Sequence, residues 1–229
     1  VHVWITPKPT RPMRILLLVV SFALVIPAFA RDLTIFSREK LAAWCIVPFD
    51  AKKRGPVERA EMLNRLGITR LAYDWRKEHI PTFDAEVEAM KAQGIEISAW
   101  WMSRGADEAN RKIFATIERY GIHPQLWVLI DEPLKGNADQ QAKVKAAADE
   151  IRPLVEEAKR LGCQVGLYNH GGWFGEPENQ IAIIKELNLP NVGIVYNFHH
   201  GHAHIDRFPE LFAKMQPYLI ALNLNGMLK

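Results

Sequence analysis

Half of the histidines in this chain lie in one short stretch. Four of the eight fall between residues 199 and 204, and His170 stands further upstream, between Asn169 and a pair of glycines. Imidazoles at such spacing can carry protons near neutral pH or share a metal ion. His170 and His200 are therefore predicted catalytic residues, and His200 is also a candidate metal ligand. The alternatives are a solvated polar loop for this stretch and a hydrogen-bonded loop histidine for His170.

A pair of carboxylates, Asp131 and Glu132, follows the apolar run of residues 127–130. A carboxylate at a strand exit can act as a general base or bind a metal ion. It can also cap the helix or loop that comes next. Side chains alternate along a strand, so only one of the pair should point inward, and we expect Glu132 to do so. Glu132 is thus predicted to be a catalytic residue and a metal ligand.

Six tryptophans between residues 44 and 173 lie in predicted strands or directly after them. The flat face of an indole stacks on the C–H face of a sugar, which is a common arrangement at carbohydrate sites. We expect Trp75, Trp101 and Trp173 to contact substrate and the other three to pack in the core.

Short apolar runs alternate with amphipathic stretches along the chain. The runs are rich in β-branched and aromatic residues, as is typical of strands buried on both faces. They lie at residues 42–47, 69–73, 95–101, 126–130, 164–168, 192–196 and 219–223. Helical periodicity marks residues 57–66, 82–92, 108–120, 137–161, 177–187 and 208–215. Four of these helices are followed by a glycine and then a strand, which indicates one repeated βα unit.

The regular spacing of these units predicts the fold. Seven strand starts are 26 to 39 residues apart, and no glycine-rich nucleotide-binding turn follows them. This pattern favours a (β/α)8 TIM barrel over a doubly wound sheet. An eighth strand would start near residue 246, beyond Lys229, so we expect a TIM barrel truncated after strand seven. A seven-stranded or open sheet is the alternative. In a TIM barrel the polar strand ends meet at one rim, where active sites lie.

Composition separates a basic leader from a neutral body. The formal charge is +3, and Lys8, Arg11 and Arg14 are the only charged residues before Arg31. The remaining chain has 26 basic and 26 acidic residues, which argues against a nucleic-acid partner. A hydrophobic share of 48% and a charged share of 24% are those of a globular domain, so a disordered chain is excluded.

Residues Met13–Ala30 have the three parts of a secretory signal peptide, namely a basic start, an apolar run and an A-x-A ending. We expect residues 1–30 to be upstream residues plus this signal peptide and residues 31–229 to form the barrel domain. The predicted location is secreted or periplasmic, in a bacterium, with no membrane attachment after cleavage. An uncleaved anchor is the alternative. Cys45 and Cys163 are expected to be free thiols.

Two sequence segments resemble a known family. Residues 166–172 (GLYNHGG) and 192–200 (VGIVYNFHH) resemble the ends of strands five and six in the xylose isomerase-like TIM barrels, the sugar phosphate isomerase/epimerase superfamily. The resemblance covers roughly residues 41–227. It implies a sugar or polyol substrate, a divalent metal such as Mn²⁺, Mg²⁺ or Zn²⁺, and a proton shift next to a carbonyl.

The chain departs from this family at the metal ligands. The family's strand-five glutamate falls on Tyr168, its strand-six aspartate on Asn197 and its strand-seven histidine on Asn223, while its strand-eight glutamate has no counterpart before Lys229. Neutral groups thus replace the usual ligands, which argues against a metal at these positions. Tyr168, Asn197 and Asn223 are predicted to bind substrate. A rearranged metal site of Glu132, His170 and His200 is a further hypothesis.

Three functions are compatible with these features. The first is an exported sugar isomerase or epimerase that acts on a carbohydrate or polyol by proton transfer next to a carbonyl. The second is a glycoside-cleaving lyase or hydrolase, with Glu132 as acid and His200 as base. The third is a non-catalytic carbohydrate-binding barrel with a degenerate metal site. In each case the partner is a small carbohydrate, and the oligomeric state is not predicted.

Overall fold

The computed structural model describes residues 34–103, 107–134, 136 and 138–224. These residues belong to one compact unit that starts at Thr34. The predicted signal peptide at Met13–Ala30 lies outside the described residues. Within the described ranges no helix is both long and apolar enough to cross a membrane.

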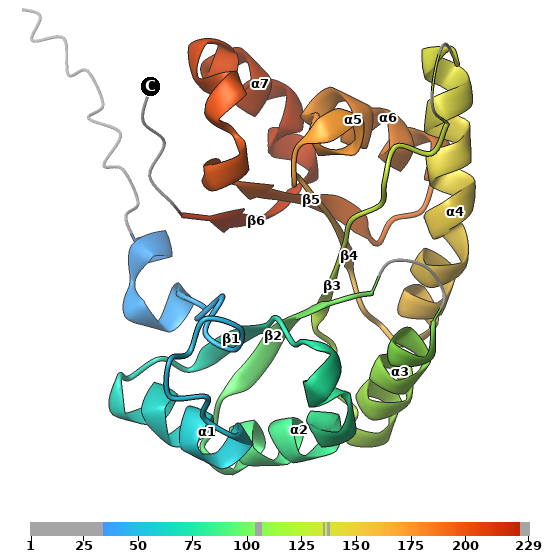
Figure 1. Ribbon diagram of the computed structural model, residues 1–229. Coiled ribbons are helices and arrows are strands. Elements are labelled where there is room, and N and C mark those ends of the chain that lie inside the picture. Colours follow the sequence, from blue (N-terminus) through green and yellow to red (C-terminus); the bar gives the residue numbers. More distant parts are fainter. Residues whose placement is uncertain (1–33, 104–106, 135, 137, 225–229) are drawn as a thin grey trace, which may run out of the picture. The chain divides into compact units, whose positions relative to one another are not determined.

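Six parallel strands form one sheet in their sequence order. They are β1 (Arg70–Tyr73), β2 (Glu96–Trp101), β3 (Gln125–Val128), β4 (Val165–Tyr168), β5 (Val192–Asn197) and β6 (Leu219–Asn223). At least one helix connects each strand to the next, as in an α/β barrel. The sheet curls, and the helices lie on its outer side (Figure 1). The predicted fold class is confirmed, in the form of a half-barrel of six parallel strands.

The helices lie close to their predicted positions. They are α1 (Pro56–Arg65), α2 (Phe83–Ala92), α3 (Glu108–Tyr120), α4 (Gln140–Arg160), the short α5 (Gly172–Gly175), α6 (Pro177–Leu187) and α7 (Phe208–Met215). The 3₁₀ helices are η1 (Thr34–Phe36), η2 (Arg38–Lys40), η3 (Lys77–Thr82), η4 (Phe198–His200), η5 (His202–Arg207) and η6 (Gln216–Tyr218).

Local sequence signals explain where the helices begin and end. The side chains of Asp107 and Asp139 accept hydrogen bonds from the first free backbone N–H groups of α3 and α4. The glycine at the end of α3, Gly121, has a φ of 59°, a left-handed conformation that costs other residues more. The same positive φ recurs at the glycines after α1, α2 and α4. The repeated helix–glycine–strand unit is therefore confirmed.

One predicted strand is almost absent. Residues 42–47 contribute a single parallel bridge, from Ala43 to Leu71 of β1, instead of a seventh strand. The chain turns immediately afterwards, because Cys45 has a φ of 58° and residues 46–49 form turns. A left-handed residue cannot continue an extended strand, so the pairing ends after Ala43.

The sheet carries one apolar core on each face. The larger core packs the outward side chains of the strands, such as Leu71 and Trp100, against the helices. The smaller core lies on the concave face and consists of Ala72, Ala99, Trp127, Tyr168 and Val195, flanked by Trp44, Trp101, Ile220 and Ala221. Because side chains alternate along each strand, the concave face also receives the residues two positions after these.

The free thiols predicted for Cys45 and Cys163 are confirmed.

Candidate active site

Tyr168 lies at the centre of the concave face, at the carboxyl end of β4, with 1% of its surface exposed. Its phenol oxygen accepts a hydrogen bond from Nδ2 of Asn223 at 3.1 Å and another from Nδ2 of Asn197. Asn223 is the last residue of β6 and Asn197 is the last residue of β5. The ends of three neighbouring strands therefore meet at one hydroxyl group. Burial raises the pKa of Tyr168 to about 12, although the two amide donors oppose the rise. The hydroxyl is therefore protonated at neutral pH.

Asn197 also positions the loop that follows β5. Its Oδ1 accepts a hydrogen bond of 2.8 Å from the backbone N–H of His199, and this caps η4. Asn169 joins the same two strand ends, because its Oδ1 accepts from the Asn197 N–H at 2.6 Å and its Nδ2 donates to the Asn197 carbonyl at 3.2 Å. Both asparagine side chains are fully buried. The direction in which the histidine loop leaves the sheet is thus set by paired amides.

The structure brings the predicted catalytic histidines together. The ring centroids of His170 and His200 are 4.1 Å apart, and each ring lies a little over 6 Å from the Tyr168 ring. His170 is exposed, whereas His200 is half-buried. Burial, and then the neighbouring His170, lower the pKa of His200 to about 4. His200 is therefore a neutral imidazole at physiological pH.

Aromatic rings line the other side of Tyr168. The Trp101 ring meets Tyr168 edge-on with centroids 4.4 Å apart, and the Trp127 ring is stacked at 6.0 Å. Trp75 packs against Phe83 in the outer core and donates from Nε1 to the Trp101 carbonyl at 2.7 Å. Trp101 is therefore placed to contact a ligand on the concave face, while Trp75 supports the strand end that carries it.

Glu132 lies apart from this cluster. Its carboxylate is paired with Lys143 of α4, and 39% of its side chain is exposed. β3 ends at Val128, so the alternation of side chains stops before Glu132 is reached. The expected inward orientation of Glu132 does not occur, and its carboxylate faces the helix side.

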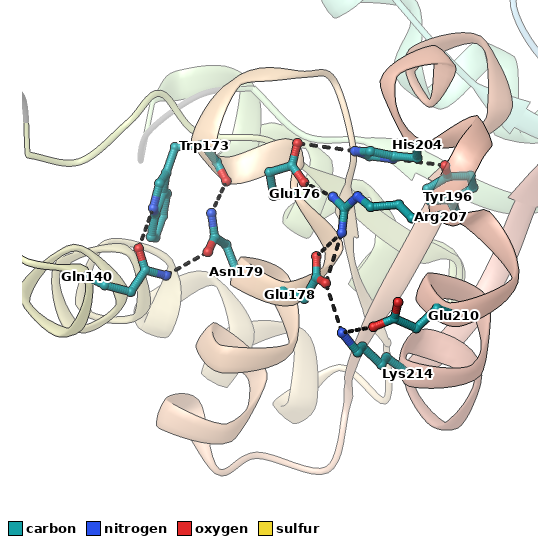
Figure 2. Close-up of polar contacts among 10 residues, drawn as sticks. All are labelled: Gln140, Trp173, Glu176, Glu178, Asn179, Tyr196, His204, Arg207, Glu210 and Lys214. Carbon is teal, nitrogen blue, oxygen red and sulfur yellow. Dashed lines mark hydrogen bonds and ion pairs between the residues drawn. The ribbon is translucent and has the colours of Figure 1, made fainter.

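Trp173 and His204 belong to two further groups of polar contacts, on the helix side of the sheet (Figure 2). Trp173 donates from Nε1 to Gln140 of α4 at 2.9 Å. His204 is buried between the Tyr196 hydroxyl at 3.0 Å and the Glu176 carboxylate at 3.1 Å, and Arg207 bonds the same carboxylate at 2.6 Å. The contacts of His204 and Arg207 fasten η5 to the start of α6, so they hold the loop beyond His200 in place.

The residues at the family's ligand positions do not fit a divalent cation. Tyr168 is protonated, and Asn197 and Asn223 turn their N–H groups, not their carbonyl oxygens, toward it. No carboxylate joins His170 and His200: within the described part of the chain, no three side chains of His, Cys, Asp or Glu are grouped so that they could hold a metal ion. Hard cations need several oxygen ligands that bear charge. Glu132 and His200 therefore do not form the hypothesised rearranged metal site here.

Two residues that the sequence analysis did not select lie on the same concave face. Asp74 follows β1 and is two positions beyond Ala72, and Trp44 packs beside Tyr168 with ring centroids 6.4 Å apart. Alternation along β1 would have placed Asp74 next to Trp101, since the residues before them, Tyr73 and Trp100, are register partners. Only the pairing of the strands reveals that register.

Comparisons with known proteins identify the fold. No protein-family model matches the chain, and no curated protein matches it. Solved structures do match. A 3-keto-D-glucoside 4-epimerase from E. coli has a TM-score of 0.63 at 15% identity, covering 80% of this chain and 78% of its own.

Two further structures show the range of proteins that share this fold. A probable 3-DHS dehydratase from Bacillus anthracis has a TM-score of 0.62 at 13% identity, covering 80% of this chain and 72% of its own. A xylose isomerase-like TIM barrel protein from Mycobacterium smegmatis was solved in complex with magnesium. It has a TM-score of 0.53 at 17% identity, and the match covers 76% of this chain and 68% of that protein. The chain therefore has the xylose isomerase-like TIM barrel fold, as predicted from the resemblance of residues 166–172 and 192–200. Because this fold supports both epimerases and dehydratases, the activity has to be argued from the site.

Proposed function

We propose that this protein is a sugar isomerase- or epimerase-like enzyme, which moves a proton on a carbon next to a carbonyl group of a carbohydrate or polyol. One observation carries the proposal: the Tyr168 ring and the His170–His200 pair lie together at the ends of neighbouring strands, with ring centroids 6.3 and 6.1 Å apart. A proton acceptor beside a hydrogen-bond donor is what an enolisation needs. The epimerase named among the similar structures supports a sugar as substrate.

Tyr168 would bind the carbonyl oxygen. Its phenol oxygen already accepts two hydrogen bonds, which uses both of its lone pairs, and no described residue accepts the hydroxyl hydrogen. That hydrogen is left for a ligand oxygen. Two amide donors on the phenol oxygen strengthen the O–H as a donor, so it can stabilise negative charge that develops on the carbonyl oxygen.

The histidine pair would move the proton. His170 is exposed, so water can solvate its imidazolium after it takes the proton from carbon. His200 is neutral and adjacent, so it can hydrogen-bond His170 or the substrate without repelling that positive charge. When the C–H bond breaks, its electron pair forms the C=C bond of an enediolate and the carbonyl π pair moves onto the oxygen, to which the Tyr168 hydroxyl donates its hydrogen bond. Return of the proton from His170 to carbon re-forms the carbonyl group and completes the step. Trp101 would stack on the sugar, and Asn197 and Asn223 would hold Tyr168 in place.

The test is exchange of carbon-bound hydrogen with solvent. We expect the wild-type protein to incorporate deuterium next to the carbonyl of at least one aldose, ketose or keto-sugar in D₂O, measured by proton NMR. His170→Gln and Tyr168→Phe should each lower the exchange rate by roughly 100-fold or more. His123→Gln is the matched control. His123 lies just before β3, at the opposite end of the strands from the candidate site, where its ring hydrogen-bonds the Leu161 carbonyl.

Other outcomes of this assay would replace the proposal. Release of reducing ends from an oligosaccharide without exchange would identify a glycoside-cleaving enzyme. Sugar binding without any turnover would identify a carbohydrate-binding barrel, the alternative that the neutral residues Tyr168, Asn197 and Asn223 favour.

We also propose that the protein is exported from a bacterial cytoplasm, secreted or into the periplasm. The support is the signal-peptide pattern of Met13–Ala30. Expression of the full chain in a bacterial host, followed by N-terminal sequencing of the periplasmic fraction, should give a mature start at Arg31. Retention of the uncut chain in the cytoplasm would contradict export, and an uncut chain in the membrane fraction would indicate an anchor.

A further inference from the structure

Two buried polar groups on the concave face have no hydrogen-bond partner. Asp74 is 3% exposed, and neither carboxyl oxygen forms a hydrogen bond with any described residue. The indole N–H of Trp44 is buried and equally without a partner. Buried polar groups almost always find partners, and a carboxylate without one is expensive. Such a pair therefore needs an explanation beyond packing.

The chain segments that carry the two groups run side by side. Ala43 pairs with β1, since its N–H donates to the Arg70 carbonyl and its carbonyl accepts from the Ala72 N–H, both at 2.8 Å. Trp44 and Cys45 consequently run alongside the end of β1, and Cys45 acts electrostatically on the Asp74 carboxyl. Asp74 and Cys45 also act on the pKa of Tyr168. The unpartnered groups thus border the same concave cluster as the candidate active site.

The surrounding residues do not satisfy the carboxyl group. The Arg76 guanidinium lowers the pKa of Asp74 electrostatically, yet its Nη1 donates to the backbone carbonyls of Asp74 at 3.1 Å and Trp75 at 2.8 Å, and not to the carboxylate. The Cys45 thiol and the Val47 N–H lie close by but outside hydrogen-bond geometry. Burial consequently raises the pKa of Asp74 to about 7. The fold thus maintains a buried carboxyl group whose oxygens have no hydrogen-bond partner among the described residues.

We propose that Asp74 and the indole N–H of Trp44 bind hydroxyl groups of the sugar, with the carboxylate accepting from adjacent hydroxyls and the indole donating to a third oxygen. This inference rests on the proposed function, because it takes the ligand to be a carbohydrate. A planar carboxylate offers two acceptors side by side, which suits neighbouring hydroxyls, and the aromatic rings of Trp101 and Tyr168 lie on the same face. Residues 46–49 form turns beside the carboxyl group, and Cys45 and Val47 lie close to it.

A small carbohydrate explains the pair better than a cation. A divalent ion would require further anionic ligands, and the described residues contain no such group of three. An indole N–H would be repelled by a cation, since it can only donate. Hydroxyl groups both donate and accept, so they can satisfy both partners at once.

The experiment measures sugar affinity by isothermal titration calorimetry, with D-glucose, D-xylose, D-fructose and D-glucitol as probes. For the sugars that wild type binds, we expect Asp74→Asn to weaken binding roughly 10- to 100-fold and Trp44→Phe to weaken it about 5-fold. Wild-type affinity should rise as pH passes through about 7, because the carboxylate is the better acceptor, and this pH dependence should vanish in Asp74→Asn. Burial raises the pKa values of Cys45 and Tyr168, which both interact with Asp74, to about 12, so neither group changes its charge in this range. The guanidinium of Arg76 donates to backbone carbonyls and not to the carboxyl.

Gln180→Leu is the matched control. Gln180 is fully buried in α6 on the helix side, and its amide is also without a partner, so a purely structural role would affect it and Asp74 alike. We expect Gln180→Leu to leave sugar affinity unchanged. Should Asp74→Asn fail to fold, Trp44→Phe keeps the inference testable.

The outcomes separate this inference from the proposed function. Unchanged affinity in Asp74→Asn and Trp44→Phe, with wild-type exchange intact, would overturn the inference alone. Sugar binding that depends on Asp74, without hydrogen exchange, would overturn the enzymatic function and support the inference. If the wild-type protein binds none of the sugars, both are contradicted.

Discussion

The side-chain amide of Asn197 connects the Tyr168 hydroxyl to the loop that carries His200. Its Nδ2 donates to the Tyr168 oxygen, while its Oδ1 caps η4 through the His199 N–H. The proposed donor for the substrate carbonyl and one of the two proposed proton-handling imidazoles are thereby held by one buried residue. This arrangement gives a rigid base to residues that stand at strand ends and in a loop.

Asn197→Leu should lower the free energy of unfolding by about 2–4 kcal/mol, because it removes a helix cap and leaves the phenol and one backbone N–H with fewer partners. Asn223→Leu removes only the contact with Tyr168, so its cost should be smaller, about 1–2 kcal/mol. Urea denaturation of both variants measures the difference. Equal losses would show that the cap of η4 contributes nothing.

Tyr168→Phe should destabilise the fold by about 1–3 kcal/mol, since two buried amide donors lose their acceptor. Tyr73→Phe is the control, because the Tyr73 hydroxyl is buried without a partner and its removal should cost nothing or stabilise. Thermal unfolding followed by circular dichroism compares them. The expectation fails if the Tyr73 variant is the less stable of the two.

The stability contributed by Asp74 should depend on pH. The raised pKa means that the folded state binds more protons than the unfolded state between about pH 4 and 7, so stability falls as pH rises through this range. The fall should be about 4 kcal/mol at most. Asp74→Asn should therefore gain stability over wild type as pH increases, and the difference between the two urea-unfolding curves isolates this residue. A constant difference from pH 4 to 8 would show that Asp74 has an ordinary pKa.

His200 should act in the opposite sense. Its lowered pKa means that the unfolded state binds more protons between about pH 4 and 6.5, so stability rises with pH across this window. In His200→Gln the corresponding rise should be absent. An NMR titration of the imidazole resonances gives the pKa directly, and a value for His200 above 6 would refute the prediction.

Gly166→Ala should be strongly destabilising. A Cβ at this position would lie 2.4 Å from Cγ2 of Val195 and 3.0 Å from Cδ1 of Trp127, inside the concave core. Overpacking of this kind typically costs 1–3 kcal/mol. At Gly55, by contrast, no atom lies within 4 Å of an added Cβ, so Gly55→Ala should change stability much less. Urea denaturation of the two alanine variants would show whether the difference is real.

The order of helices and strands along the chain could be predicted because the sequence signals for it are local. Alternating apolar runs, helical periodicity and the recurring glycines each depend on a few neighbouring residues, and α3, α6 and α7 begin and end as predicted. The prediction of a strand at residues 42–47 was wrong, for a local reason that composition does not reveal. Nothing about Cys45 signals a left-handed φ, which ends the strand after Ala43.

Part of the candidate site was also within reach of the sequence. Tyr168, Asn197 and Asn223 end their strands, His170 and His200 follow closely, and the parallel sheet brings these positions to one edge. Trp101 likewise lies beside Tyr168, and its contact with substrate stays a prediction. Trp75 and Trp173 were not, because they pack toward helices whose positions the strand pattern does not specify.

The sequence by itself determined the repeating βα architecture and the set of polar residues at the strand ends, since both follow from short-range periodicity. Only the tertiary structure decided how those residues are grouped. It joined Tyr168 to two asparagines and turned Glu132 toward Lys143, because β3 stops short of that residue and alternation no longer directs it. It also left Asp74 buried without a hydrogen-bond partner among the described residues, beside a strand register that no local pattern encodes.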